Sequence, residues 1–193
     1  ATLAAIDALG ILAAGHLHAV GGAGEFHALH GPRGNVLQRD RASACEIGRT
    51  RQDLQAGDAA IGQRTSRMRI GTNLMLLPLA DPLRLAEDAA TLSILTGGRF
   101  DLGVGLGYRQ LEFDYFGRKL INRPSLMEEG VALLRAAWTG EPIRHQGKRY
   151  QVDGLMVRPA PATPPRLFMG GMAEPAIARA ARLGDGFLST GGI

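Results

Sequence analysis

Residues 65–107, TSRMRIGTNLMLLPLADPLRLAEDAATLSILTGGRFDLGVGLG, decide the fold of this chain. The stretch predicts a strand over residues 68–77, with an apolar end and a polar interruption at Thr72 and Asn73. A nearly continuous apolar strand is typical of a parallel sheet that is covered on both faces. Pro78 ends this strand, because proline cannot donate a hydrogen bond to the ladder.

A helix is predicted to follow this strand and to lead into a second one. Asp81 is a suitable N-cap, Pro82 suits the first helical position, and Gly97 and Gly98 end the helix. A second strand over residues 100–104 completes a βαβ unit, whose crossover is almost always right-handed. The helix has an apolar stripe at near-helical spacing, made of Leu85, Ala89, Leu92, Ile94 and Leu95.

The second strand ends in small residues, Gly103-Val-Gly105-Leu-Gly107. Ligands bind at this end of the strands in open α/β sheets and barrels. Glycines there let a flat or anionic ligand approach the backbone. A dinucleotide-binding G-x-G-x-x-G motif is the alternative, but Tyr108 occupies the position of its last glycine.

The remainder of the chain continues the alternation of strands and helices. The predicted elements are a helix between Pro124 and Gly140, a hairpin over 143–152 turning at Gln146-Gly147, a strand over 166–169, a helix from Glu174 to Gly184 and a strand over 185–189. His145 in the hairpin is predicted to be solvated. Aromatic residues follow Gly107, and they either wall a pocket or pack the connection onto the fold: Tyr108, Phe113, Tyr115 and Phe116.

Three segments in order resemble the bacterial luciferase-like family of flavin-dependent oxidoreductases: RTSRMRIGTNLMLLPLADPLRLAEDAATL, GGRFDLGVGLGYRQLEF and FMGGMAEPAIARAARLGDGFL. The resemblance covers about residues 64–190. Members are TIM barrels that use FMN or a deazaflavin. The expected fold class is therefore α/β, a partial TIM-type (β/α) barrel with about four parallel strands over residues 64–193 and an irregular N-terminal segment over residues 1–63.

The N-terminal segment does not show the pattern that the resemblance requires. Residues 2–14 predict a helix, but residues 15–63 lack apolar periodicity, where the family would have its first two strands and helices. A reading-frame change upstream of Arg64 and ordinary divergence would both produce this contrast. The segment contains four histidines without a zinc-binding spacing, so no metal site is predicted: His16, His18, His27 and His30.

The phosphate site is predicted at the strand that ends in Gly170-Gly171 and feeds a helix near Pro175. Backbone N–H groups and the helix dipole at such a point hold a phosphate without a basic side chain. The resemblance implies that Gly170, Gly171 and Met172 surround the flavin phosphate. The alternative is that these glycines only form a tight turn.

The resemblance also implies a site for the flavin ring. In the family, the dipeptide that matches Asn73-Leu74 forms a bulge, often with a non-proline cis bond, beside the isoalloxazine ring. The alternative for Asn73 is a buried asparagine satisfied by the backbone. The second strand adds three further cofactor-binding candidates, Gly105, Leu106 and Gly107. Some relatives have a basic residue where Leu106 stands, and Arg109 is the substitute available here.

Composition excludes several classes of protein. The chain has 193 residues, 45% hydrophobic and 21% charged, with a net charge of +4; a complete TIM barrel has about 250 residues. The arginines are scattered and aromatic residues are few, so nucleic-acid binding is not predicted. No apolar run reaches the length of a membrane span. The single cysteine, Cys45, suits a reducing compartment, and a cytoplasmic location is expected.

The function implied by the resemblance is a flavin-dependent oxidoreductase of the luciferase-like monooxygenase type. It would use FMN or a deazaflavin coenzyme in reduced form on a small organic substrate, with a flavin reductase or nicotinamide donor as partner and a homodimer as the assembly. No catalytic side chain is identified, because the cofactor carries the chemistry in such enzymes. The alternative is a truncated, non-catalytic relative, because four strands cannot close a barrel.

Overall fold

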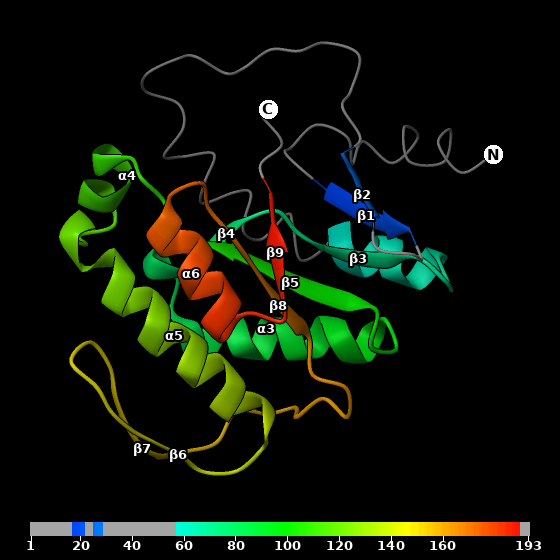
Figure 1. The fold of residues 1–193 in the computed structure, drawn as a ribbon. Coiled ribbons are helices and arrows are strands. Elements are labelled where there is room, and N and C mark those ends of the chain that lie inside the picture. The colour runs from blue at the N-terminus through cyan, green and yellow to red at the C-terminus, as the bar shows by residue number, and fades with distance from the viewer. Residues whose placement is uncertain (1–16, 22–24, 29–56, 190–193) are drawn as a thin grey trace.

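The computed structural model of the chain describes residues 17–21, 25–28 and 57–189 (Figure 1). Within these ranges a seven-stranded sheet has the order β2-β1-β3-β5-β8-β9, and β4 pairs with β5. Its strands are β1 (Leu17–Gly21), β2 (Glu25–Ala28), β3 (Arg69–Thr72), β4 (Met75–Leu76), β5 (Phe100–Gly105), β8 (Arg166–Gly170) and β9 (Gly186–Leu188). A separate hairpin consists of β6 (Ile143–Gln146) and β7 (Gln151–Leu155).

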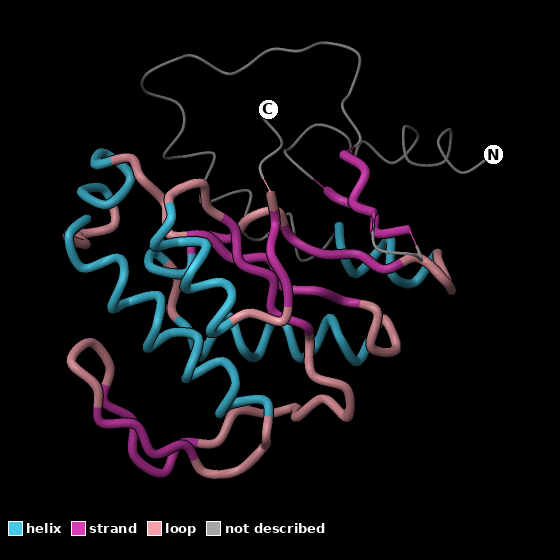
Figure 2. The backbone as a smooth tube through the Cα atoms, in the orientation of Figure 1, coloured by secondary structure: helices cyan, strands magenta, loops and turns pink. Residues whose placement is uncertain are grey.

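Helices connect the parallel strands, as Figure 2 shows. The helical elements are η2 (Leu77–Leu79), α3 (Pro82–Leu95), α4 (Gln110–Tyr115), η3 (Leu120–Asn122), α5 (Arg123–Trp138) and α6 (Glu174–Leu183), and residues 57–64 are also helical. None of the helices in the described ranges has the length and apolarity that a membrane span requires.

The predicted parallel strands are confirmed. β3 pairs with β5, β5 with β8 and β8 with β9, all in parallel. The last strand, β9, lies at the edge of the sheet, so the barrel is not closed. The carboxyl ends of these strands meet along one edge, where ligands bind in related architectures.

The hydrophobic core lies between one face of the sheet and helices α3, α5 and α6. Phe100, Leu102 and Val104 of β5 are at most 1% exposed and belong to this core. Because side chains alternate along a strand, Asp101, Gly103 and Gly105 face the opposite side, which corresponds to the interior of a barrel. Trp138 is buried against α3 and donates its indole N–H to the carbonyl of Ala86 at 3.0 Å.

Helix α3 has the predicted ends. Asp81 caps it by accepting hydrogen bonds from the N–H groups of Leu83 and Arg84, and Gly97 takes a φ of 62° just after its last turn. The predicted apolar stripe is correct only in its first part. Ile94 and Leu95 are 48% and 45% exposed, because they lie beside the buried face, which continues from Leu92 to Thr96.

The N-terminal region differs from the prediction. β1 pairs antiparallel with β2 and antiparallel with β3, whereas the family would have its first two strands and helices in this segment. Residues 57–64 are helical, although all of them up to residue 63 fall in the segment interpreted as unpatterned. The helix predicted over 2–14 lies outside the described residues, as do His16, His30 and Cys45, and the division between residues 63 and 64 stays a prediction.

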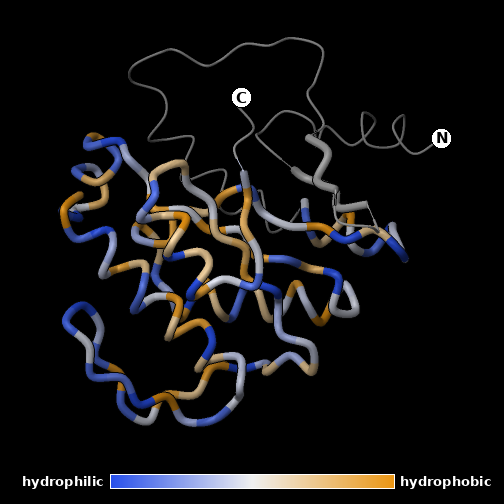
Figure 3. The backbone as a smooth tube through the Cα atoms, viewed as in Figure 1, coloured by the Kyte–Doolittle hydropathy of each residue, from blue (hydrophilic) through white to orange (hydrophobic). Residues whose placement is uncertain are grey.

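The β6–β7 hairpin turns later than predicted. Gln146 pairs with Gln151, so the turn is formed by residues 147–150. Figure 3 shows that this hairpin is largely hydrophilic. The sequence predicted that His145 is solvated, but the structure places it against a carboxylate. Its Nε2 lies 3.4 Å from Glu129 Oε2, and the same carboxylate accepts the backbone N–H of Tyr150. The Glu129 carboxylate on α5 therefore holds the turn in place through these contacts.

Candidate functional site

The strand formed by β3 and β4 contains a bulge. Gly71 pairs with Asp101 and Met75 pairs with Val104, so four steps along β3–β4 match three steps along β5. Thr72 bridges the irregular position, because its Oγ1 accepts the N–H of Gly103 at 3.0 Å and donates to the carbonyl of Gly103 at 2.9 Å. One side chain therefore replaces the backbone pairing where the strand bends.

The peptide bond between Asn73 and Leu74 is cis, within this bulge. The resemblance implied a bulge at this dipeptide, often with a cis bond, and the structure has both. Asn73 is half-buried and takes part in a polar interaction. Its role beside a flavin ring stays a prediction.

The structure brings three predicted site segments together. Gly105 pairs with Gly170 in the sheet. The side chain of Leu74 lies over both glycines: a Cβ built on Gly105 would be 3.1 Å from Leu74 Cδ1, and one built on Gly170 would be 2.6 Å from it. The bulge and the ends of β5 and β8 thus form one continuous edge.

Gly103 is required by the close approach of two strands. A Cβ on this residue would overlap the carbonyl oxygen of Thr72 and lie 2.8 Å from Leu188 Cδ1. Gly103→Ala is expected to lower the free energy of unfolding by about 1–3 kcal/mol, because the backbone of the bulge must move. Denaturant unfolding followed by circular dichroism measures this.

Gly105→Ala is the matched control for that prediction. Its Cβ would meet only the flexible side chain of Leu74, so a smaller loss is expected. Equal stability of Gly103→Ala and the wild type would contradict the close strand approach.

The turn after β8 meets the first helical turn of α6. A Cβ on Gly171 would lie 2.6 Å from Ala176 Cβ, so the turn packs tightly against the helix. Ala173, the N-cap, provides no side-chain hydrogen bond to the first turn, which leaves the helix N-terminus suited to an anion. Glu174 in the same turn is acidic and disfavours a highly charged anion. Met172 is 83% exposed beside it.

The candidate cofactor-binding residues at the end of β5 are apolar residues and glycines, which would contact a ligand through backbone groups and not through charge. Leu106 is half-buried and packs against the hydrophobic core. Gly107 has a φ of 72°, which favours glycine. Arg109, the cation that the sequence offered as a substitute, lies 3.9 Å from Glu112 and 5.7 Å from the ring centre of Tyr108.

The aromatic residues after β5 divide into two groups. Phe113 is 0% exposed and packs beneath the loop, in agreement with the packing interpretation. Tyr108 and Tyr115 are 76% and 64% exposed, so neither is packed into the core. Their place beside a substrate stays a prediction.

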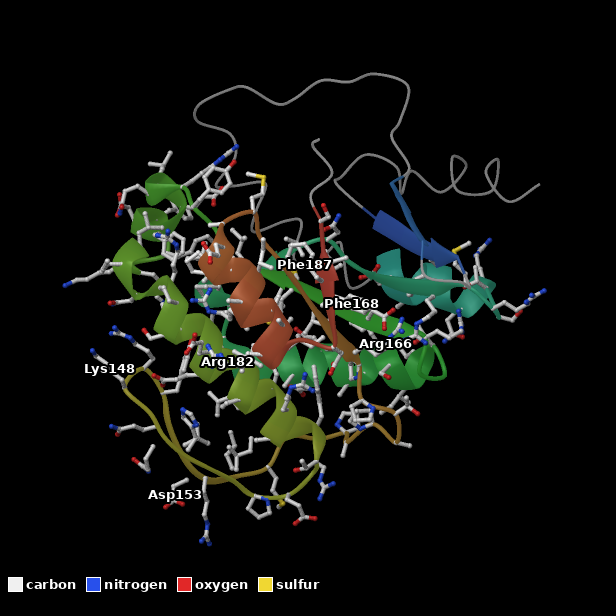
Figure 4. The ribbon with its side chains drawn as sticks, viewed as in Figure 1. Lys148, Asp153, Arg166, Phe168, Arg182 and Phe187 are labelled. Carbon is white, nitrogen blue, oxygen red and sulfur yellow. The ribbon has the colours of Figure 1, made fainter. Side chains whose placement is uncertain are left out.

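A charge cluster around one buried carboxylate lies at the other end of the same face. Asp101 accepts hydrogen bonds from Arg69 at 2.5 and 2.9 Å and from Arg166 at 2.8 and 2.9 Å. Burial acts to raise the pKa of Asp101, but the hydrogen bonds and charges of Arg166 and Arg69 outweigh it and lower the pKa below its usual value. Arg166 also lies 5.1 Å above the ring centre of Phe168 on β8 (Figure 4).

Sequence reasoning missed the side chains that shape this face. Thr72 was interpreted only as a polar interruption, and Leu188 only as part of a strand. A signal for them existed, because glycines recur at alternate positions of β5, and small residues on one strand require larger ones from its neighbours in a packed interior.

These features define an α/β protein of the TIM-barrel class, with a bulged strand and glycine-rich strand ends at the edge where proteins of this class bind ligands. The family model described as "Luciferase-like monooxygenase" matches residues 58–193. The chain belongs to this family.

Relatives agree with this membership. The chain is 34% identical over 139 residues to an F420-dependent glucose-6-phosphate dehydrogenase from Kribbella flavida, which covers 69% of this chain and 41% of the relative. A crystal structure of the monooxygenase RslO1 from Streptomyces bottropensis aligns with a TM-score of 0.60 and 29% identity, over 66% of this chain and 39% of that one.

A more distant structure, an F420-dependent secondary alcohol dehydrogenase bound to an F420–acetone adduct, aligns with a TM-score of 0.63 and 24% identity over 70% of this chain and 42% of that one. This likeness concerns the fold alone. The chain spans less than half the length of the curated relatives that it matches.

Proposed function

We propose that this chain binds a flavin or deazaflavin coenzyme and takes part in oxidation or reduction of a small organic substrate. One observation carries the proposal: the bulge at Asn73-Leu74 shares one edge with the glycine-rich ends of β5 and β8. Such an edge supports a planar ring over backbone and a phosphate at a helix N-terminus.

Each segment of this edge would contact a different part of the coenzyme. Asn73 and Leu74 would support the ring, Gly105, Leu106 and Gly107 would border it, and the segment from Gly170 to Met172 would hold the phosphate. The bound coenzyme would supply hydride transfer or oxygen activation, and the protein would position it and exclude water. No side chain in the described residues needs to act as a nucleophile.

The choice of coenzyme follows the relatives. The Kribbella flavida relative is F420-dependent by name, which favours a deazaflavin, and FMN is the alternative within the family. A reductase or nicotinamide donor and a homodimer belong to the same proposal, as does a cytoplasmic location.

Titration of the purified protein with FMN and with coenzyme F420, followed by fluorescence and equilibrium dialysis, tests the proposal. Binding of one of them in the micromolar range is expected. Asn73→Ala is expected to weaken binding at least about tenfold, if the bulge supports the ring. Asp153→Asn on exposed β7 is the control and should bind as the wild type does (Figure 4). Failure to bind either coenzyme contradicts the proposal.

A non-catalytic relative is the second candidate, and the open edge at β9 favours it. A parallel barrel closes by pairing its first and last strands, and β9 has one partner, β8, in the described sheet. Coenzyme binding without turnover of reduced coenzyme by oxygen or by a panel of alcohols and aldehydes would support this candidate. Turnover would exclude it.

A further inference from the structure

The glycines at the ends of β5 and β8 have a neighbour that explains them without a ligand. Leu74 leaves the bulge and extends across β5 as far as β8. A Cβ on Gly170 would meet both of its methyl groups, Cδ1 at 2.6 Å and Cδ2 at 3.2 Å. On Gly105 it would meet Cδ1 at 3.1 Å and Cβ at 3.5 Å. The same side chain thus limits both positions.

The two glycines form a single gap in the face of the sheet. Gly105 and Gly170 are registered partners on adjacent strands, and each is buried. Protein interiors are closely packed, so such a gap is filled. Leu74 fills it from the bulge between β3 and β4. The glycines therefore accommodate the side chain of Leu74, and their predicted place beside a coenzyme stays a prediction.

This packing links two parts of the site that are far apart in sequence. Leu74 contributes its backbone to the Asn73–Leu74 peptide, and Gly170 begins the turn into α6. A side chain at position 170 would push Leu74 back and move the peptide to which it belongs. A change at position 170 would thus move the Asn73–Leu74 peptide, which the proposed function places beside the ring, through the side chain of Leu74.

We propose that Leu74 is a positioning residue that couples the Asn73–Leu74 peptide to the Gly170-Gly171 turn. The inference rests on the proposed function for its consequence in coenzyme binding. The coupling itself is a property of the folded chain and can be measured without coenzyme.

A double-mutant cycle tests the coupling. Gly170→Ala is made in the wild type, in Leu74→Ala and in Leu74→Val; the valine variant removes both δ carbons but keeps a branched apolar side chain if the alanine variant folds poorly. Thermal and denaturant midpoints are measured first. Gly170→Ala is expected to lower the midpoint in the wild type and to lower it much less when Leu74 is shortened. A residual loss is expected, because the carbonyl oxygen of Leu188 lies 3.1 Å from the added Cβ.

Two glycine controls sharpen the cycle. Gly105→Ala should lose its smaller effect entirely when Leu74 is shortened, because Leu74 supplies every close contact at that position. Gly103→Ala should be unaffected by Leu74, because its clash is with the backbone of Thr72. An equal effect of Gly170→Ala in all three backgrounds would overturn the proposal.

The same variants are then titrated with FMN and coenzyme F420. Gly170→Ala is expected to weaken binding about tenfold, and shortening Leu74 in that background should recover part of the loss. Loss of binding that Leu74 does not modify would overturn the functional part of the inference. If the wild type binds neither coenzyme, the proposed function fails, while the midpoints still decide whether Leu74 couples the two segments.

Discussion

Asp101→Asn is expected to lower the free energy of unfolding by roughly 3 kcal/mol, because an amide in the place of this buried carboxylate cannot accept hydrogen bonds from both arginines. Asp101 is 2% exposed, and four N–H donors from Arg69 and Arg166 converge on its carboxylate. Arg69 and Arg166 come from β3 and β8, so the carboxylate joins three parallel strands. Chemical denaturation at neutral pH measures the loss.

An exposed ion pair provides the control for Asp101. Arg84 and Glu87 pair at 2.8 Å on the surface of α3, and Glu87→Gln is expected to change stability by less than about 1 kcal/mol. Similar losses for the two variants would show that the three-strand cluster contributes no more than a surface pair does.

The effect of Asp101 should depend on pH in a definite direction. Its pKa in the folded chain lies below the ordinary value of 3.8. The stabilisation from this carboxylate is therefore fully present above that value and is lost as the pH falls through the folded pKa. The gap between wild type and Asp101→Asn should narrow in acid. A gap that stays constant from neutral pH into acid would contradict this.

Local signals in the sequence predicted the parallel part of the fold. Asp81 and Pro82 fixed the start of α3 and Gly97 fixed its end, because capping and positive φ are decided within one turn. The register of β3 against β5 was not predictable in this way. It depends on Thr72 replacing a backbone partner, a contact between residues 31 positions apart.

The bulge was predicted in position, but the reason for the glycines beside it was not. The resemblance gave the bulge at Asn73-Leu74, and the structure confirms it. It did not give the reason for Gly105 and Gly170, because a glycine that admits a ligand and one that admits a neighbouring leucine are identical in sequence. Only the position of Leu74 separates the two explanations.

The helix over residues 57–64 was not predicted, for a different reason. This helix has small residues where a helix usually has large apolar ones, and they let it approach the sheet. Its sequence therefore shows little apolar periodicity. A Cβ on Gly62 would overlap the side chain of Thr96 and lie 3.4 Å from Ile70 Cδ1. Close packing through glycine and alanine gives a weak hydrophobic pattern, and Asp58 weakens it further.

Asp58 is the most unusual group of this helix. It lies four residues before Gly62 and hence on the same helical face, toward the core. It is 1% exposed, and neither carboxylate oxygen has a hydrogen-bond partner among the residues that the structure describes. Burial raises the pKa of Asp58 from 3.8 to about 7.

Asp58→Leu is therefore expected to stabilise the protein, and more strongly as the pH rises. The folded chain keeps the proton up to about pH 7, whereas the unfolded chain releases it near the ordinary value, so this group lowers stability progressively between those two pH values. Above them the full penalty applies, at most about 4 kcal/mol. Unfolding free energies of wild type and variant, measured from roughly pH 4 to pH 8, should diverge across that interval.

Two comparisons separate ionisation from packing in this experiment. Asp58→Asn keeps the shape and cannot ionise, so it should also remove the pH-dependent divergence, although its buried amide lacks partners and reduces the gain. Asp153→Asn, an exposed carboxylate on β7, should leave the pH dependence as in the wild type. Parallel curves for wild type and Asp58→Leu across the interval would mean that Asp58 is ionised in the folded chain. Its carboxylate would then need a compensating cation, and the helix could not be held by apolar packing alone.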